Sequence, residues 1–433
     1  MIFAFALTLP LVACKKEDDN QNNNEGPVYS ETTPSFSANS NLNATGNTHY
    51  FPYVFASTSD PMVLWSEKDG TDTKVRGVKL SGTAASGSTI DALTDLGIQN
   101  SGESTNHAIA FDESTSKYLA VVMHNETSDF GMRAKLFTST DQSEVLFDVE
   151  GPYQYAPTAN RPAIASNNNG IFGLVYHTNS GFYSDSKIAF KTINASTGEV
   201  SPAAASESIT GIEISGVQCQ FPDIAWNASA NVFGIVYHTG VTSSSKVMFT
   251  SVDVNGNVVT APTAIYSNAT TGQFPKIKED GSGFAVMWQE FGAVKFGEDT
   301  ELTGVPHIMF KRITATGGDV AVTGDANIVD TEKNTVIMSN PYLAEAYIHF
   351  DLVVKTAGSE YGLVWATQNA PYQIQFAKAL YSGNEVTTTA PVDLSVSTEQ
   401  SDKPTIDFAA GQYVITYVGH NGSKSETRIV AGN

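Results

Sequence analysis

An apolar segment recurs seven times along this chain and ends each time in a large side chain. The end residues are Trp65, Met123, Tyr176, Tyr237, Trp288, Trp365 and Tyr417. Neighbouring end residues lie 51 to 61 residues apart, with one longer interval before Trp365. A regular period of this length indicates that the chain stacks copies of one supersecondary unit.

Each repeat combines short apolar segments with turn sequences. In the third repeat the segments start at Arg161, Phe172, Lys187 and Val200. The sequence Asn-Asn-Asn-Gly at 167–170 separates the first two and supplies residues that tolerate a positive φ. The second segment is apolar on consecutive residues, which indicates a strand buried on both faces. Each repeat therefore predicts four short strands in meander order.

The repeats predict an all-β protein, a seven-bladed β-propeller of four-stranded antiparallel blades over residues 28–433. The seventh repeat ends after three strands, near Val430, whereas Val28 to Ser37 is a spare extended stretch. We expect this N-terminal strand to complete the last blade, which would leave no sheet edge exposed. Six blades is the alternative if the first repeat is irregular.

First strands frequently begin with a residue followed by proline. We expect proline at the first position of these strands, where its missing N–H costs no ladder hydrogen bond. The pairs are Phe51-Pro52, Arg161-Pro162, Phe221-Pro222, Phe274-Pro275 and Lys403-Pro404. With these features the chain resembles bacterial seven-bladed β-propellers of degenerate-repeat type. It lacks the Gly-His and Trp-Asp signatures of WD40 repeats and the Asp-box turns of sialidases, and a fold alone assigns no function.

The composition suits a large core and argues against nucleic acid as a partner. The 433 residues are 41% hydrophobic and include 35 Gly. With 45 acidic and 24 basic residues, the net charge is −21, which opposes attraction to a phosphate backbone. Of the two cysteines, Cys219 is expected to be a small core residue, and no intrachain disulfide is expected.

The first residues have the pattern of an export signal. Residues Ile2 to Ala13 are apolar but too few to span a bilayer, and they lead into Leu11-Val12-Ala13-Cys14. This sequence resembles the lipobox of bacterial lipoproteins. The resemblance implies a signal peptide over residues 1–13 and a lipid on Cys14 that anchors the protein to a membrane. No Lys or Arg precedes the apolar run, which leaves open whether the chain starts upstream of Met1.

Residues 14–27 are expected to form a flexible polar tether. The segment Lys15 to Asn20 is charged or polar, and an Asn-rich stretch follows, a composition that cannot bury apolar area. The acidic residues after the cysteine also resemble the export tag of surface-exposed lipoproteins in some Gram-negative bacteria. We therefore expect an outer-membrane lipoprotein displayed on the cell surface, with the periplasmic face as the alternative.

All eight histidines fall in segments that a propeller places on one face. The start of the first strand and the end of the second share a face of the blade, where binding residues usually lie. The first group, near first-strand starts, is His49, His107 and His349. The second follows second strands or lies in second-to-third loops: His124, His177, His238, His307 and His420. This face is the predicted working face.

Three interpretations apply to His124, His177 and His238, which occupy equivalent positions in consecutive repeats. Each can make the same structural hydrogen bond to a neighbouring loop, join Arg161 in binding hydroxyls or carboxylates, or ligate a metal. Adjacent blades hold equivalent positions too far apart for one ion. Asp253 to Asn257 faintly resembles a calcium loop but fits a hairpin turn better. We predict no metal site and no cofactor.

The candidate ligand-binding residues are the polar side chains expected on this face. They are His107, His124, Arg161, His177, His238, Gln289, Glu290, His307 and His349. Carboxylates near the face could supply a pair for glycoside hydrolysis, but the sequence does not give their separation. We assign the repeat-end aromatic residues to packing between blades, and Phe51, Phe221, Phe274 and Phe350 to an inner packing ring.

Two segments near the fifth repeat are expected to rise over the histidine face. They are Gly292 to Pro306, in a second-to-third loop, and Thr331 to His349, before the sixth repeat. Long loops of this kind commonly serve binding, and together they would wall one side of a groove.

Two classes of function remain open. The first is a membrane-anchored lipoprotein, held by the lipid on Cys14, whose propeller face binds a polysaccharide or an envelope protein without catalysis. The second is a carbohydrate-active enzyme, for which a polysaccharide lyase fits best because propeller lyases use His, Tyr and Arg on one face. His107, His124, Arg161 and His177 would supply those types here. A purely structural scaffold is a third possibility, and the ligand and the oligomeric state stay unassigned.

Overall fold

The computed structural model describes strands and tight turns from residue 29 to the last residue. The described ranges are 29–30, 40–41, 48–55, 62–69, 72–81, 84–93, 107–126, 129–138, 146–153, 158–179, 186–203, 212–215, 218–240, 245–265, 271–291, 294–296, 300–302, 307–318, 335–339, 349–367, 372–382, 385–395, 399–409, 411–421 and 424–433. Within them no helix is long and apolar enough to cross a membrane. The predicted signal peptide and tether lie outside the described residues.

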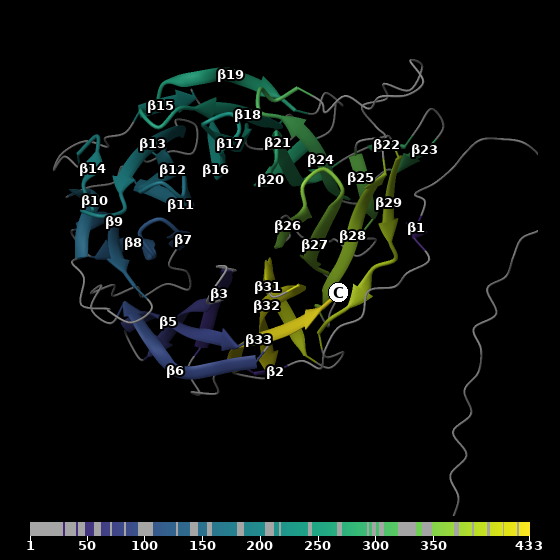
Figure 1. The fold of residues 1–433 in the computed structure, drawn as a ribbon, viewed down its shortest axis with the longest axis horizontal. Helices are drawn as coiled ribbons and strands as arrows, with labels where there is room; N and C mark the ends of the chain where they lie inside the picture. Colours follow the sequence, from purple (N-terminus) through teal and green to yellow (C-terminus); the bar gives the residue numbers. More distant parts are fainter. Residues whose placement is uncertain are drawn as a thin grey trace, which may run out of the picture.

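Seven antiparallel sheets stand around one axis, as the repeats predict (Figure 1). The innermost strands of blades one to seven are β3 (Thr48–Phe55), β7 (His107–Asp112), β11 (Thr158–Ser166), β16 (Cys219–Asn227), β20 (Thr271–Asp280), β26 (Phe350–Thr356) and β31 (Gln400–Ala409). The second strands are β4 (Met62–Asp69), β8 (Lys117–Glu126), β12 (Ile171–Asn179), β17 (Val232–Thr239), β21 (Gly283–Phe291), β27 (Glu360–Ala366) and β32 (Gln412–Asn421).

The third strands carry each meander outward to the rim. They are β5 (Asp72–Ser81), β9 (Asp129–Phe137), β13 (Lys187–Asn194), β18 (Lys246–Val252), β24 (His307–Thr314), β28 (Ile374–Ser382) and β33 (Lys424–Gly432). The outer strands are β6 (Ala84–Leu93), β10 (Leu146–Tyr153), β14 (Val200–Ser201) with β15 (Ile212–Ser215), β19 (Val258–Ala264), β25 (Thr335–Ser339), β29 (Glu385–Thr389) with β30 (Val392–Asp393), and β2 (Ser40–Asn41). The fold is a seven-bladed β-propeller.

An N-terminal strand closes the ring, but not with the residues we expected. Strand β2 pairs antiparallel with β33, with Ser40 opposite Ile429, and so becomes the fourth strand of blade seven. Within Val28 to Ser37, the predicted closing stretch, the described strand β1 (Tyr29–Ser30) instead pairs in parallel with β29 of blade six. The chain therefore attaches to two blades before it enters blade one.

The X-Pro pairs lie inside the first strands and not at their first residues. In blade three the register between β11 and β12 jumps from Asn160 to Ala163, so Arg161 and Pro162 form a bulge. Equivalent shifts flank the pairs in blades one, four, five and seven. Because bulged residues are left out of the ladder, the missing N–H of proline costs no hydrogen bond there. The sequence rule for proline was right, but its position in the strand was wrong.

Blades pack through the predicted aromatic residues and through glycines that receive them. The end residues described with side chains are fully or almost fully buried: Trp65, Tyr176, Tyr237, Trp288, Trp365 and Tyr417. A second set of aromatic residues lies near the starts of the second strands, and each packs onto a glycine of the preceding blade. A Cβ at Gly173 would lie 2.8 Å from Phe233 Cε1, and one at Gly362 would lie 2.6 Å from Tyr413 Cε1. Because these glycines carry no side chain, the aromatic rings can pack directly on the strand, and the blades approach one another closely.

On the face opposite the predicted site, polar side chains join successive blades at their first turns. Asp112 of blade two accepts hydrogen bonds from Ser166 Oγ at 2.6 Å and Gly170 N at 3.0 Å. Asp280 of blade five accepts from Gly358 N at 2.6 Å and Tyr361 Oη at 2.8 Å of blade six. Each buried carboxylate thus accepts hydrogen bonds from groups at the first turn of the next blade, so the described carboxylates on this face hold neighbouring blades together.

Two local predictions are settled by the described turns. Asp253 Oδ1 accepts from Asn257 N at 2.8 Å between β18 and β19, so the calcium-like sequence is a hairpin turn. The expected insertion Thr331 to His349 contains β25, which pairs with β24 as the outer strand of blade five, so it is not simply a loop over the face. The other segment holds a hairpin of β22 (Val294–Phe296) and β23 (Thr300–Leu302).

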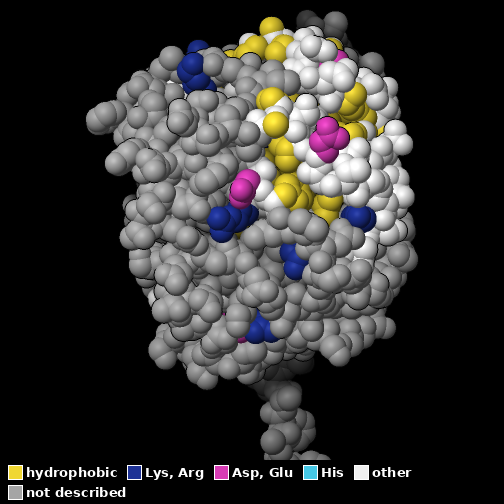
Figure 2. Space-filling view, turned by 90° about the vertical axis from the view of Figure 1, so that its left-hand side faces the viewer, with side chains coloured by type: hydrophobic (Ala, Val, Ile, Leu, Met, Phe, Trp, Pro, Cys, Tyr) yellow, Lys and Arg dark blue, Asp and Glu magenta, His cyan; other side chains and the backbone are white. Residues whose placement is uncertain are grey.

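The flank of the disc shows no concentration of one charge among its described side chains. On the side formed by blades two and three, Lys and Arg are interspersed with Asp, Glu and apolar groups (Figure 2). A mixed surface of this kind is typical of solubilising exteriors.

Candidate functional site

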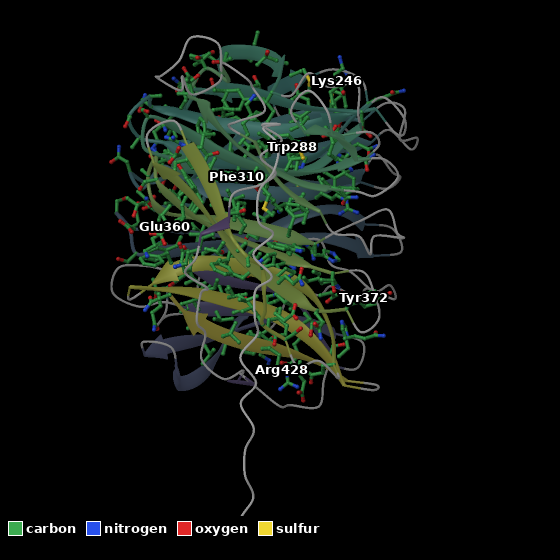
Figure 3. The ribbon with its side chains drawn as sticks, turned by 90° about the vertical axis from the view of Figure 1, so that its right-hand side faces the viewer. Lys246, Trp288, Phe310, Glu360, Tyr372 and Arg428 are labelled. Carbon is green, nitrogen blue, oxygen red and sulfur yellow. The ribbon has the colours of Figure 1, made fainter. Side chains whose placement is uncertain are left out.

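The two faces of the disc differ in what they carry. We call strand-start face the one on which the first strands begin, at His107, Thr158, Cys219, Thr271, Phe350 and Gln400, and the second strands end. Viewed edge-on in Figure 3, Lys246 and Tyr372 near the starts of third strands lie on its side, and Glu360 at the β26–β27 turn lies on the other. The predicted shared position of first-strand starts and second-strand ends is confirmed by the pairing of β11 with β12 and of β16 with β17.

The bulges place four equivalent side chains close to the axis on this face. Arg161, Phe221, Phe274 and Lys403 each precede a proline and have φ values of 51°, 51°, 54° and 53°. This left-handed backbone is costly for a residue with a side chain, on the order of 1–3 kcal/mol, and such strain is concentrated at functional sites. The same strained backbone position therefore recurs in four blades, and it carries a cation in two of them and a phenylalanine in the other two.

Phe221 is the centre of a cluster that spans blades three, four and five. The Arg161 guanidinium carbon lies 3.9 Å from the Phe221 ring centroid, within cation–π distance. The His238 ring stacks on Phe221 with centroids 5.1 Å apart, and Phe274 meets it edge-on at 4.5 Å. We assigned both phenylalanines to packing, yet each keeps part of its surface exposed. Their position before proline in the bulge was the signal that set them apart.

His238 fulfils the structural interpretation of the repeated histidine, whereas His177 does not. Phe274 N donates to His238 Nδ1 at 3.2 Å, which ties blade four to blade five. His177 is 1% exposed, and neither of its ring nitrogens has a hydrogen-bond partner in the described part of the chain. Burial and the nearby Arg161 charge lower the pKa of His177 to about 3 and that of His238 to about 4. Both imidazoles are therefore neutral at physiological pH.

The charges of three cations from different blades act on His349. Burial, together with the charges of Lys403, Lys276 and Arg161, lowers the pKa of His349 to about 4, against the opposite effect of Asp402. These residues belong to blades three, five, six and seven, so the group spans the axis. We call Arg161, Lys276, His349 and Lys403 the central cluster. Three cations thus act on one histidine, with Asp402 opposing them, in a chain with a net charge of −21.

A chain of hydrogen bonds fixes Asp402 next to Lys403. His420 Nε2 lies 3.2 Å from Asp402 Oδ1, and His420 Nδ1 lies 2.7 Å from Ser425 Oγ. The hydrogen bond from His420 and the nearby positive charges lower the pKa of Asp402 against the effect of burial. Ser, His and Asp in this order are known from hydrolases. Here Ser425 faces His420 across the β32–β33 hairpin, and the arrangement serves to position the carboxylate.

Deeper along the innermost strands, acidic and basic side chains alternate. Asp223 Oδ2 accepts from Ile277 N at 2.9 Å, and Asp351 Oδ2 accepts from Ile406 N at 3.2 Å, each joining two blades. Burial alone would lower the pKa of Lys278, but Asp351, Asp223 and Asp407 raise it above its usual value. Lys278 therefore stays charged and neutralises the carboxylates around it, a structural role.

Glu290 is a buried acid near the end of β21. It is 1% exposed and accepts a hydrogen bond from Trp288 Nε1 at 2.7 Å. Burial raises its pKa to about 8. The preceding Gln289, the counterpart of His177 and His238 in blade five, is fully buried. A neutral carboxyl group can donate a hydrogen bond, but nothing described places Glu290 next to the central cluster.

The remaining predicted residues are not brought to the central cluster by described contacts. His107 hydrogen-bonds through Nδ1 with Ser66 Oγ at 3.1 Å and packs edge-on against Tyr53, both in blade one. The side chains of His124 and His307 lie outside the described residues, although their backbones belong to β8 and β24. The described residues hold no group of three or more His, Cys, Asp or Glu with the geometry of a metal site.

Comparisons with known proteins find similarity in fold. No protein-family model and no curated protein matches the sequence. Among solved structures, the polysaccharide lyase Uly1 matches with a TM-score of 0.52 and 10% identity over 96% of this chain and 94% of the lyase. The NanB sialidase of Streptococcus pneumoniae gives 0.45 and 10% over 89% of this chain and 68% of that one, and the phage phi92 endosialidase gives 0.46 and 10% over 91% and 68%. Similarity at this identity shows a shared fold and not a shared activity.

Proposed function

We propose that the protein binds an acidic polysaccharide, one that carries uronate units, at the central cluster of the strand-start face. The observation behind this proposal is that Arg161 and Lys403 occupy equivalent bulge positions of two innermost strands. Their charges and that of Lys276 act on the same histidine, His349, in an otherwise acidic protein. A planar guanidinium can hold a carboxylate through two parallel hydrogen bonds, and the lysines add positive charge. The cluster therefore suits a carboxylate better than a neutral group.

The aromatic groups beside the cations fit a sugar ring. Phe221 lies against Arg161 and meets Phe274, and both rings are partly exposed and present apolar surface on which the C–H face of a sugar can pack. An acidic saccharide carries the complementary groups, a carboxylate next to the apolar C–H face of its ring. The overall fold similarity to a polysaccharide lyase supports a carbohydrate ligand, since that fold holds a polysaccharide site in at least one other protein.

Binding without catalysis is the first candidate, and a polysaccharide lyase is the second. The second is favoured by a specific observation, because Arg161 could neutralise a uronate while neutral His177, close enough for its pKa to respond to that charge, accepts the α-proton. A general base works best with a pKa near the operating pH, however, and those of His177 and His238, at about 3 and 4, are far below it. This is why binding ranks above elimination.

The cellular setting completes the proposal. A lipid on Cys14 would anchor the propeller to the outer membrane through the polar tether of residues 14–27, displayed at the surface or, alternatively, at the periplasmic face. There it would capture a polysaccharide or an envelope protein. Metabolic labelling with a fatty acid, comparing wild type with Cys14→Ser, tests this part: loss of label and of membrane sedimentation is expected, and unchanged sedimentation of the variant would contradict it.

The main experiment measures binding and product formation together. Wild-type protein is incubated with polygalacturonate and with dextran as an uncharged control, and affinity and the appearance of unsaturated sugars are followed. We expect saturable binding of polygalacturonate and no binding of dextran. Arg161→Met and Lys403→Met should each lower the affinity for polygalacturonate about tenfold or more. The matched control is Lys246→Met, which removes an exposed charge from the same face without touching the central cluster.

Each outcome separates the candidates. Equal binding of dextran, or unchanged affinity in Arg161→Met and Lys403→Met, would refute recognition of an acidic ligand at the central cluster. Unsaturated products that disappear in His177→Ala would establish the lyase instead of the non-catalytic module. Binding without products would support capture.

A further inference from the structure

The repeated histidine makes its hydrogen bond to the next blade at one junction between blades and lacks it at another. At the junction of blades four and five, Phe274 N donates to His238 Nδ1, and the two rings meet edge-on with centroids 5.4 Å apart. At the junction of blades three and four, the equivalent pair is His177 and Phe221, whose backbone has the same left-handed conformation. There the ring centroids are 6.2 Å apart at 52°, and the hydrogen bond is not made.

The difference leaves His177 with unused hydrogen-bonding capacity in a buried position. Both ring nitrogens are buried without a partner in the described part of the chain, in contrast to His238. Nε2 of Gln220, next to Phe221 on β16, is also buried and unpartnered there. Buried polar groups without partners are destabilising and uncommon, so they call for an explanation such as a ligand that completes them.

We propose that His177 is a recognition residue for a hydroxyl group of the saccharide whose carboxylate is held by Arg161. A neutral imidazole offers one N–H donor and one nitrogen acceptor, which matches a hydroxyl, since a hydroxyl both accepts and donates. A carboxylate can only accept, and the adjacent Arg161 already provides for it. The site would thus read a sugar that carries a carboxylate and a nearby hydroxyl. This inference rests on the proposed binding of an acidic polysaccharide.

Neutrality of the imidazole is built into its surroundings. The ring is enclosed next to Phe221, and the positive charge of Arg161 disfavours protonation. His177 therefore keeps one donor and one acceptor throughout the physiological pH range. Its part in recognition would be hydrogen bonding and not charge, which distinguishes it from the central cluster.

Two polyanions separate hydroxyl recognition from charge recognition. Polygalacturonate carries carboxylates and hydroxyls, whereas polyacrylate carries carboxylates alone. We expect wild type to bind polygalacturonate more tightly than polyacrylate. His177→Leu should bind polygalacturonate about tenfold more weakly than wild type and polyacrylate with unchanged affinity. Arg161→Met should weaken binding of both polymers.

Thermal unfolding of the same variants distinguishes recognition from a structural role. We expect His177→Leu to unfold at the wild-type temperature or above it, because the substitution removes unpartnered buried nitrogens. His238→Leu is the matched control and should unfold at a lower temperature, because it leaves Phe274 N without its acceptor.

The possible failures of the two proposals can be told apart. If wild type binds neither polymer, or if Arg161→Met binds both normally, the proposed function is refuted and this inference with it. If wild type binds in an Arg161-dependent manner but His177→Leu keeps the full preference for polygalacturonate, the hydroxyl role alone is refuted. A fall in unfolding temperature for His177→Leu as large as that for His238→Leu would assign His177 to structure.

Discussion

Single residues on the strand-start face show how one repeated position can take different roles. His177, His238 and Gln289 are equivalent in blades three, four and five, and all three are buried. His238 accepts a hydrogen bond from the next blade, and His177 does not. Sequence equivalence is therefore not equivalence of function. The deciding contact is made with a different blade, which is why the position in the repeat alone could not reveal it.

The buried carboxyl group of Glu290 makes stability depend on pH in a defined direction. Its folded-state pKa of about 8 exceeds the usual 4.5, so between these values the folded protein keeps a proton that the unfolded chain releases. This difference lowers stability as the pH rises from about 4.5 to about 8. Glu290→Gln keeps an acceptor for Trp288 Nε1 and removes the penalty. We expect the variant to gain stability over wild type at the upper end of this range, and little or none near its lower end.

Urea unfolding at the two ends of this pH range measures the effect. The limiting size is about 1.4 kcal/mol for each unit by which the pKa is raised. A difference between variant and wild type that is the same at both pH values would show that Glu290 is not protonated in the folded protein. Trp288→Phe is a useful companion variant, because it removes the indole donor while Glu290 itself is kept.

The elements of the fold were predictable where they depend on periodicity. Consecutive apolar residues in Phe172 to Tyr176 predicted a strand buried on both faces, and β12 is such a strand. The bulges were not predictable in the same way, because proline is tolerated both at the start of a strand and in a bulge. Consequently Phe221 and Phe274 were assigned only to an inner packing ring. Phe274 does pack against the core, whereas Phe221 lies against the Arg161 guanidinium and meets Phe274 edge-on.

Strand-to-strand packing between blades gives a prediction for Gly173. The first aromatic ring of β17 rests on this glycine, and a Cβ there would lie 2.8 Å from Phe233 Cε1. Both groups are buried, so Gly173→Ala forces the ring or the blades apart. We expect a loss of about 1–3 kcal/mol in the free energy of unfolding, the usual effect of overpacking a core.

A second substitution tests whether the contact with Phe233 is the cause. Phe233→Leu alone should destabilise by removing buried apolar surface, but combined with Gly173→Ala it makes room for the new methyl group. The double variant should therefore lose less stability than the sum of the two single variants. Strict additivity in chemical denaturation would show that the methyl group is accommodated elsewhere.

For the whole molecule, a small group of cations stands in a chain that is strongly acidic overall. A net charge of −21 repels polyanions at a distance, whereas Arg161, Lys276 and Lys403 attract them at contact. Recognition would then depend on close contact with the central cluster and not on long-range attraction. The repeats predicted the ring and the face that carries the candidate residues. Arg161 was among the predicted residues, but Lys276 and Lys403 were not, because each cation comes from a different blade and only ring closure brings them together.

Closure of the ring by β2 gives the last prediction. Strand β2 covers the outer edge of β33, with Ser40 and Asn41 opposite Ile429 and Arg428. A variant that begins at Phe36 keeps β2, and one that begins at Gly46 loses it, while both lack β1. We expect the shorter variant to unfold at lower temperature and to self-associate, because an uncovered strand edge pairs with other chains. A peptide of residues 36–45 added in trans should suppress the association by pairing with β33. Identical unfolding temperatures and monomeric behaviour of both variants would show that blade seven is stable with three strands.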